Sequence, residues 1–284
     1  MYPMTAKPVT ADGAKTKNHG AAAVLAHGMI SWASGPLKAR PLTLYGRAFS
    51  RLFFPETCPL CANFLRTWEK KICGSCEGLF CELRAPLCLQ CAQELPPFSG
   101  VSVCGDCRHG RHEVDRTWTL FSYNEPFKKI LHLIKFCGKP ALLRVFENKL
   151  KDFAEVTDWP AFDFMIPVPL DRIRQWERGF NQSYLLTLLL EKFLRIPIDH
   201  RILQKKSTAS PQSTLPKKER LLNIRGSFKV REAEKIRGRR ILLVDDIYTT
   251  GATVNECARV LKEAGADSVC AFTLARALLG RDMP

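Results

Sequence analysis

Two adjacent carboxylates precede a hydroxyl-rich turn in the segment ILLVDDIYTTGAT, residues 241–253. Four apolar residues run into Asp245 and Asp246, which is typical of a buried strand that reaches the ligand-binding carboxyl edge of a parallel sheet. Pleating would point the two side chains in opposite directions if the strand continued. We therefore expect a strand-to-loop transition, where both carboxylates can reach a polyhydroxyl ligand or one that is bound to Mg²⁺.

The turn that follows has the composition of a phosphate-binding loop. Backbone N–H groups at the start of a helix point at an anion, the helix dipole favours negative charge, and a glycine lets the backbone approach. Phosphate and two carboxylates repel each other when adjacent, but they are compatible if a ribose lies between them. A threonine-capped helix after an ordinary strand is the alternative, and it leaves the carboxylate pair unexplained. The candidate phosphate-binding residues are Thr249, Thr250, Gly251, Ala252 and Thr253.

Nine of the twelve cysteines fall within residues 58–107, and eight of these form four C-x-x-C pairs. Each pair presents two thiolates at metal-ligand spacing, and four thiolates satisfy a tetrahedral Zn²⁺ ion. The pattern predicts structural zinc, one ion or two, and leaves open which pairs share an ion. An iron–sulfur cluster or a thiol relay is the alternative, and cluster motifs normally space their cysteines differently. The predicted ligands are Cys58, Cys61, Cys73, Cys76, Cys88, Cys91, Cys104 and Cys107; Cys81, Cys137, Cys257 and Cys270 remain.

Basic residues are concentrated in one part of the chain. The formal net charge is +15, and residues 201–240 contain 13 Lys or Arg against 3 Glu, a net charge of +10. Such a cluster favours a polyanionic partner: nucleic acid, a phosphorylated small molecule or pyrophosphate. A solvated basic loop is the alternative that charge alone does not exclude.

Composition also bears on the compartment. The sequence has no apolar run long enough for a transmembrane helix, which takes about 18 or more uncharged residues. Residues 21–33 are the only candidate for a signal peptide, and they lack a good cleavage context. Because the cysteines have metal-ligand spacing and no convincing export signal accompanies them, we predict a cytoplasmic protein without membrane insertion.

Strand and helix patterns alternate from residue 116 onward. The predicted strands span 116–123, 162–170, 239–247 and 267–276, and the predicted helices span 126–138, 181–196 and 253–265. Alternation with continuous apolar strands predicts an α/β fold whose parallel sheet is covered on both faces. The predicted domains are an irregular extension (1–50), a cysteine-rich module (51–115) and the α/β domain (116–284).

The segment LLVDDIYTTGAT resembles the signature of type I phosphoribosyltransferases, which bind 5-phosphoribosyl-1-pyrophosphate. Over about residues 52–276 the chain resembles the ComF family, whose members join a double zinc ribbon to such a domain. The motifs that carry this resemblance are the four cysteine pairs, LIKFCGK (133–139), PVPLDRIRQWERGFNQ (167–182) and TASPQSTLPKKERLLNIRGSF (208–228). The resemblance implies a type I phosphoribosyltransferase fold with a small N-terminal zinc module.

The resemblance also implies roles for individual residues. Asp245 and Asp246, as the catalytic pair, would hold the ribose hydroxyls, partly through water or Mg²⁺, and the turn at 249–253 would hold the 5′-phosphate. The pyrophosphate would lie on Val168, Pro169 and Leu170, with positive charge from Arg172, Arg174 and Arg178. A solvated helix start is the alternative for these arginines. Segment 204–228 would be the mobile loop that closes over substrate, with Lys205, Lys206, Arg220 and, from an earlier helix, Lys135 as weaker candidates.

Two functional hypotheses follow from these motifs. In the first, the domain binds phosphoribosyl pyrophosphate or a similar ribose 5-phosphate ligand with Mg²⁺; transfer to a base stays open, because no segment indicates a base pocket. In the second, which the resemblance to the ComF family implies, the protein is a non-catalytic accessory that binds single-stranded DNA during natural transformation, with a competence helicase as partner. The fold would then serve as a scaffold or a ligand sensor. The two hypotheses are compatible, since a basic segment can serve either polyanion. The sequence does not indicate an oligomeric state.

Overall fold

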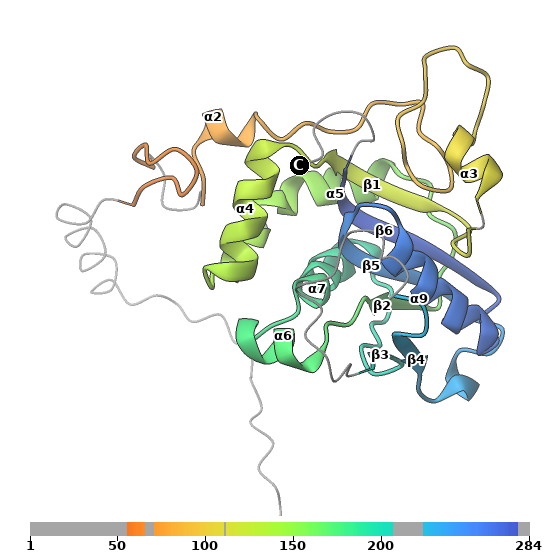
Figure 1. Ribbon diagram of the computed structural model, residues 1–284. Helices are drawn as coiled ribbons and strands as arrows, with labels where there is room; N and C mark the ends of the chain where they lie inside the picture. The colour runs from red at the N-terminus through yellow and green to blue at the C-terminus, as the bar shows by residue number, and fades with distance from the viewer. Residues whose placement is uncertain (1–55, 66–70, 111, 207–223, 278–284) are drawn as a thin grey trace, which may run out of the picture. The chain divides into compact units, whose positions relative to one another are not determined.

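The computed structural model describes residues 56–65, 71–110, 112–206 and 224–277, all within the unit Phe49–Pro284. Four of the described strands form one parallel sheet in the order β1 (Thr117–Ser122), β6 (Ser268–Arg276), β5 (Arg240–Tyr248), β2 (Phe164–Pro167). The prediction of an α/β fold with a parallel sheet is therefore confirmed (Figure 1). In the part of the chain that the structure describes, no helix combines the length and the apolar character that a membrane span requires.

Alternate residues of the central strand β5 face two separate hydrophobic clusters. Leu242 and Val244 belong to one cluster, and Ile241 and Leu243 belong to the other. All four are almost completely buried, which explains why the strand is apolar without interruption. The strand runs to Tyr248, so the expected transition at the two aspartates was placed too early: both lie inside the strand.

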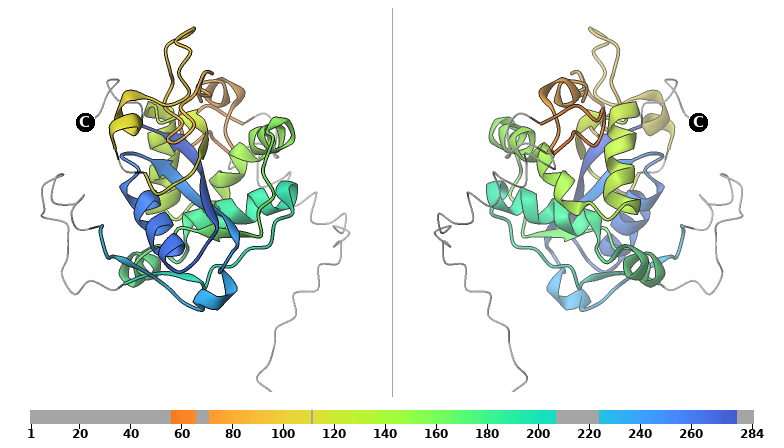
Figure 2. Two further views of the ribbon diagram at one scale, coloured as in Figure 1. Left: turned by 90° about the vertical axis from the view of Figure 1, so that its right-hand side faces the viewer. Right: turned by 90° about the vertical axis from the view of Figure 1, so that its left-hand side faces the viewer.

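Helices cover both faces of the sheet. The first face carries α4 (Glu125–Phe136), α5 (Glu147–Val156) and α7 (Gln182–Leu194), and the second carries α9 (Ala252–Glu263). Figure 2 shows α7 and α9 on opposite sides of the strands. The predicted helices 126–138, 181–196 and 253–265 correspond to α4, α7 and α9. The sequence reading did not assign the helical segments η1 (Pro140–Phe146), α5, α6 (Arg172–Arg178) and η3 (Ala233–Lys235), nor the hairpin of β3 (Leu203–Lys205) and β4 (Phe228–Val230).

Helix α4 illustrates how local sequence sets these elements. Asn124 caps the helix, because its Oδ1 accepts a hydrogen bond from the Phe127 backbone N–H at 3.2 Å. Phe127, Ile130, Leu131 and Ile134 are buried at the spacing of one helical face. That face packs on the sheet, and Lys135, at the border of the same face, pairs with Asp246 at the carboxyl edge.

The cysteine-rich segments divide between the two faces. Cys58 and Cys76 belong to the cluster of the first face, whereas Cys88, Cys91 and Cys107 belong to that of the second. The short helices α2 (Gly74–Glu77) and α3 (Gly105–His109) each contain the last cysteine of one group. Between the groups, the chain runs along strand β1, with the Leu83 N–H donating to the Leu120 carbonyl at 3.0 Å. This contact covers an edge of the sheet that would otherwise be open.

Candidate functional site

The eight paired cysteines form two tetrads that follow one another in sequence. Within each tetrad all Sγ atoms lie within 4.8 Å of one another. A tetrahedral Zn²⁺ ion with bonds of about 2.3 Å places its sulfurs about 3.8 Å apart; the Cys61 and Cys73 Sγ atoms are 3.5 Å apart and those of Cys91 and Cys104 are 3.7 Å apart. The tetrads therefore fit two structural zinc ions, and the structure answers which pairs combine. The first tetrad is Cys58, Cys61, Cys73 and Cys76; the second is Cys88, Cys91, Cys104 and Cys107.

Backbone donors favour the thiolate form of one cysteine in each tetrad, whereas burial raises the pKa of Cys76, Cys91 and Cys107. Burial opposes ionisation of Cys58, but backbone N–H groups, that of Cys73 first, lower the pKa of its thiol to about 6. Burial likewise opposes ionisation of Cys88, and the Cys104 N–H, 3.3 Å from its Sγ, helps to lower the pKa of that thiol to about 7. Thiolates are the form that binds metal. Of the remaining cysteines, Cys257 and Cys270 are buried, as expected for core positions, and Cys81 and Cys137 are exposed.

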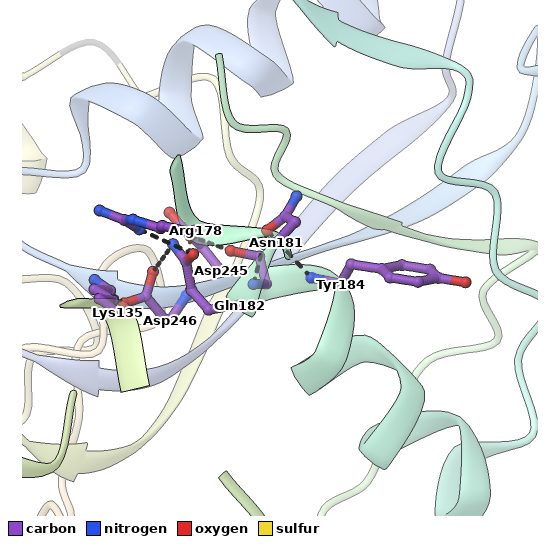
Figure 3. A network of polar contacts seen from close by, with 8 residues as sticks. Lys135, Arg178, Asn181, Gln182, Tyr184, Asp245 and Asp246 are labelled. Carbon is purple, nitrogen blue, oxygen red and sulfur yellow. Dashed lines mark hydrogen bonds and ion pairs between the residues drawn. The ribbon is translucent and has the colours of Figure 1, made fainter. Parts of the chain in front are cut away.

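Asp245 and Asp246 are the centre of a second site, at the carboxyl edge of the sheet (Figure 3). Asp245 Oδ1 accepts hydrogen bonds from Ser183 Oγ at 2.8 Å and from the Asp246 N–H at 2.9 Å. Asp246 Oδ1 accepts a hydrogen bond from Gln182 Nε2 at 3.2 Å, and its Oδ2 forms an ion pair with Lys135 Nζ. Asp246 is only 5% exposed. Helices α4 and α7 thus supply the partners of both carboxylates.

The start of helix α7 is fixed to the loop that follows β2. Asn181 caps the helix: its Oδ1 accepts hydrogen bonds from the Ser183 N–H at 2.9 Å and from the Tyr184 N–H at 3.4 Å. Its Nδ2 donates to the Val168 carbonyl at 3.0 Å. One residue therefore aligns the carboxylate partners with the loop after β2. Gly179, with φ of +74°, ends α6 and lets the chain reverse between the two helices.

The two carboxyl groups have opposite titration behaviour. Burial, together with the negative charge of Asp246, raises the pKa of Asp245 to about 7. Burial also opposes ionisation of Asp246, but the charge of Lys135 outweighs it and lowers the pKa of Asp246 below its usual value. One carboxylate is therefore held ionised, and the other holds a proton until near neutral pH. This division is expected when two acids share a buried site and one cation lies closer to one of them.

The raised pKa of Asp245 predicts that the free energy of unfolding falls as the pH rises. Its pKa is about 7 in the folded protein and about 3.9 in an unfolded chain, so between these values only the folded state retains the proton. The protonated Asp245 carboxyl group makes its full contribution to the free energy of unfolding below a pH of about 4. This contribution is lost as the pH rises to about 7. Asp245→Asn is expected to remove this part of the decline. Melting temperatures of both proteins from pH 4.5 to 7.5 test it, and parallel curves would contradict it.

The turn at 249–253 combines exposed hydroxyls with a buried glycine. Thr249 and Thr250 are exposed, and Thr250 Oγ1 accepts a hydrogen bond from the Ala252 N–H at 3.4 Å. Gly251 has φ of +77° and is followed directly by helix α9. The first N–H groups of a helix have no carbonyl partner within it. The turn therefore offers backbone donors at the positive end of the α9 dipole.

Two features favour glycine at position 251: its backbone angle and the close approach of the Tyr248 side chain. A Cβ at Gly251 would lie 2.1 Å from the Tyr248 hydroxyl, whereas Gly238, with φ of +69°, has nothing within 4 Å of such a Cβ. Gly251→Ala is expected to lower the free energy of unfolding by roughly 1–3 kcal/mol for its backbone angle, and by more because the Tyr248 ring must move. Gly238→Ala should cost only the first part. Chemical denaturation of both variants measures the difference, and equal costs would contradict the packing argument.

The predicted pyrophosphate residues are not all brought together. Val168 is buried and continues the pairing with β5, and Pro169 and Leu170 are half-buried. Residues 172–178 form helix α6, capped by Asp171. Arg172 and Arg174 are exposed on this helix. Arg178 alone among the three joins the carboxylate network, donating from Nη1 to Gln182 Oε1 at 3.1 Å.

Part of the predicted closing loop, including Arg220, lies outside the described residues. Its two ends pair as strands β3 and β4. Lys205 is half-buried on β3, and burial lowers the pKa of its ammonium group; Lys206 is exposed. Sequence reasoning gave no role to Asn181, Gln182 and Ser183, although an Asn soon after a glycine is a helix-start signal that pointed to them.

Comparison with known proteins places these features in context. The double zinc ribbon domain matches residues 49–108, and the phosphoribosyl transferase domain matches residues 186–284. Competence protein ComFC of Bacillus subtilis is 34% identical over 225 residues, covering 76% of this chain and 88% of that protein. Competence protein F of Haemophilus influenzae is 29% identical, covering 79% and 99%, and DNA utilization protein YhgH of Escherichia coli is 30% identical, covering 80% and 100%.

Proposed function

Because this chain belongs to the ComF family of competence proteins, we propose that it binds phosphoribosyl pyrophosphate with Mg²⁺ and acts in DNA uptake in the cytoplasm. The observation that supports this ligand is the order of carboxylates and backbone N–H donors along strand β5 and the turn that follows it. Only Ile247 and Tyr248 separate the Asp245–Asp246 pair from the helix-start turn at 249–253. A ribose 5-phosphate needs the same order: acceptors for its hydroxyls, then donors for its phosphate.

Each end of the ligand has a counterpart in the chain. Asp245 and Asp246 accept hydrogen bonds from the ribose hydroxyls, and the backbone N–H groups of the 249–253 turn donate to the 5′-phosphate. The pyrophosphate lies beside Val168, Pro169 and Leu170, with Arg178 as the nearest guanidinium in the carboxylate network. Carboxylate oxygens are the ligands that Mg²⁺ prefers, so these aspartates fit it. When bound, Mg²⁺ neutralises charge on the pyrophosphate.

Calorimetry tests this proposal on the zinc-loaded, full-length protein. Phosphoribosyl pyrophosphate with Mg²⁺ is expected to bind with saturable heat, and ribose 5-phosphate is expected to compete with it. Absence of saturable heat with both ligands would overturn the proposal. Release of pyrophosphate after addition of individual bases then tests whether transfer follows binding.

Single-stranded DNA binding is the second candidate, and a cavity beside the carboxylates favours it. The cavity has a volume of about 530 Å³ and shares the side chains of Lys135 and Arg178 with the carboxylate network. Its lining contains both aromatic rings and basic groups, a combination suited to stacked bases and backbone phosphates. Phe136 is 66% exposed, and the Arg178 guanidinium lies 5.0 Å from its ring centre. The other lining groups include Tyr123, Lys128, Lys129 and His132.

Salt titration with a single-stranded oligonucleotide tests the second candidate. The logarithm of the affinity should fall linearly with the logarithm of the salt concentration, by about 0.7 for each phosphate contacted. Phe136→Ala is expected to weaken binding by roughly 1–3 kcal/mol if one base stacks there. Phe98→Ala, a fully exposed phenylalanine in the cysteine-rich region, is the matched control. A flat salt response, or equal loss in both variants, would remove this candidate.

A further inference from the structure

Arg276, the last residue of β6, connects the second cysteine tetrad to the centre of the molecule. Its side chain is only 3% exposed. Its Nη1 donates to the Cys91 carbonyl at 2.5 Å, and its Nε donates to Gln93 Oε1 at 3.1 Å. Both acceptors, one a backbone carbonyl and one a side-chain amide, belong to the turn of Cys88 and Cys91, the first cysteine pair of the second tetrad. The guanidinium thus has a fixed orientation that depends on the shape of that turn.

The other side of the same guanidinium covers Tyr248. The Arg276 Cζ lies 4.6 Å from the centre of the Tyr248 ring, and the ring is 2% exposed. The Tyr248 hydroxyl fills the space that a side chain at position 251 would occupy, 2.1 Å from an ideal Cβ there. A continuous series of buried contacts therefore runs from Cys91 through Arg276 and Tyr248 to Gly251.

The first tetrad has a different relation to the fold. Cys58 and Cys76 pack in the cluster beneath α4, on the face opposite to α9. The chain after this tetrad bonds to the cap of α4, with Asn124 Nδ2 donating to the Leu79 carbonyl at 2.9 Å. Helix α4 carries Lys135, the partner of Asp246. Each tetrad thus contacts a different element that carries a residue of the proposed ligand site.

We infer that the second zinc ribbon positions the 249–253 turn, with Arg276 and Tyr248 as the connecting residues. This inference rests on the proposed binding of a 5′-phosphate by that turn. If the Cys88–Cys91 turn loosens, Arg276 loses two buried acceptors, and a buried guanidinium without partners is costly. Reorientation of Arg276 uncovers the Tyr248 ring, and the turn loses the surface on which Gly251 rests. Lysine cannot replace Arg276, because it lacks the planar group that bonds and stacks together.

Arg276→Lys tests the inference with two readouts. Backbone amides of residues 249–253 are expected to exchange hydrogen faster in the variant, as measured by mass spectrometry. Affinity for ribose 5-phosphate is expected to fall roughly tenfold, while affinity for pyrophosphate stays within about twofold. Pyrophosphate is the internal control because its proposed site is the loop after β2. Arg116→Lys is the matched variant: Arg116 also stacks on an aromatic ring, that of Trp118 at 4.7 Å, and is exposed.

The outcomes separate this inference from the proposed function. Unchanged exchange in residues 249–253, or equal losses of affinity for both ligands, would overturn the inference. If the wild type binds neither ligand, the proposed function fails, and the exchange comparison still decides the inference. Gln93→Ala removes one acceptor of Arg276 without changing the buried cation. It is expected to change exchange in the same direction by a smaller amount, which keeps the test decisive if Arg276→Lys does not fold.

Discussion

Asp246→Asn is expected to weaken binding of phosphoribosyl pyrophosphate with Mg²⁺ by about 100-fold, because the variant loses the charge proposed to hold both hydroxyls and metal. A hydrogen bond to a charged group contributes about 1.5–3 kcal/mol. The substitution also leaves Lys135 without its anion. A buried charge without its partner costs about 3–5 kcal/mol, so the melting temperature should fall as well. Calorimetry and thermal unfolding measure the two effects separately.

A second substitution distinguishes lost binding from lost stability. Lys135→Met together with Asp246→Asn removes both members of the buried ion pair, and it should recover much of the stability without recovering affinity. Asp163→Asn is the control for an aspartate of the same sheet. Asp163 accepts a hydrogen bond from the Arg240 N–H at the opposite end of the strands, and its loss should leave affinity unchanged. Full affinity in the double variant would contradict the role given to Asp246.

Removal of zinc is expected to unfold both cysteine-rich segments and to destabilise the sheet between them. Structural zinc supplies about 10–16 kcal/mol of apparent binding free energy in small zinc modules. Here the effect extends further, because Cys58 and Cys76 pack in one core cluster and Cys88, Cys91 and Cys107 pack in the other. Metal analysis should find two zinc ions per chain, and chelation should lower the melting temperature sharply.

Single-site variants refine this expectation. Serine in place of Cys76 should release one zinc ion, and serine in place of Cys107 should release the other, because each belongs to a different tetrad. Cys137→Ser is the control, since Cys137 is exposed and belongs to neither tetrad. It should retain both ions and the wild-type melting temperature. Complete release of zinc without a change in melting temperature would show that the tetrads do not stabilise the fold.

Local patterns predicted most of the elements in the α/β domain. The strand at residues 117–122 is rich in aromatic and β-branched residues, and the strand at 268–276 is largely apolar. Helix α4 has its apolar residues at helical spacing. Helix α6 was missed because none of its residues is buried. Its sequence therefore has no sustained repeat of apolar residues at helical spacing. The strand-to-loop transition expected at Asp245 and Asp246 was placed too early for a related reason. Two charged residues inside a strand interrupt the apolar pattern, although Lys135, Ser183 and Gln182 make their burial possible.

The sequence by itself determined those candidate ligand groups that lie close together along the chain. Cysteines separated by two residues, and the run DDIYTTGAT, place their ligand atoms together through local geometry alone. Only the tertiary structure decided which cysteine pairs combine, that Lys135 neutralises Asp246, and that Arg276 reaches Cys91 across 185 positions of the chain. These contacts arise where separate helices and strands pack on a common sheet. Which residues meet in these contacts depends on how whole faces of helices and strands are buried, and not on residues nearby in the sequence. For this reason no local sequence pattern predicts the contacts.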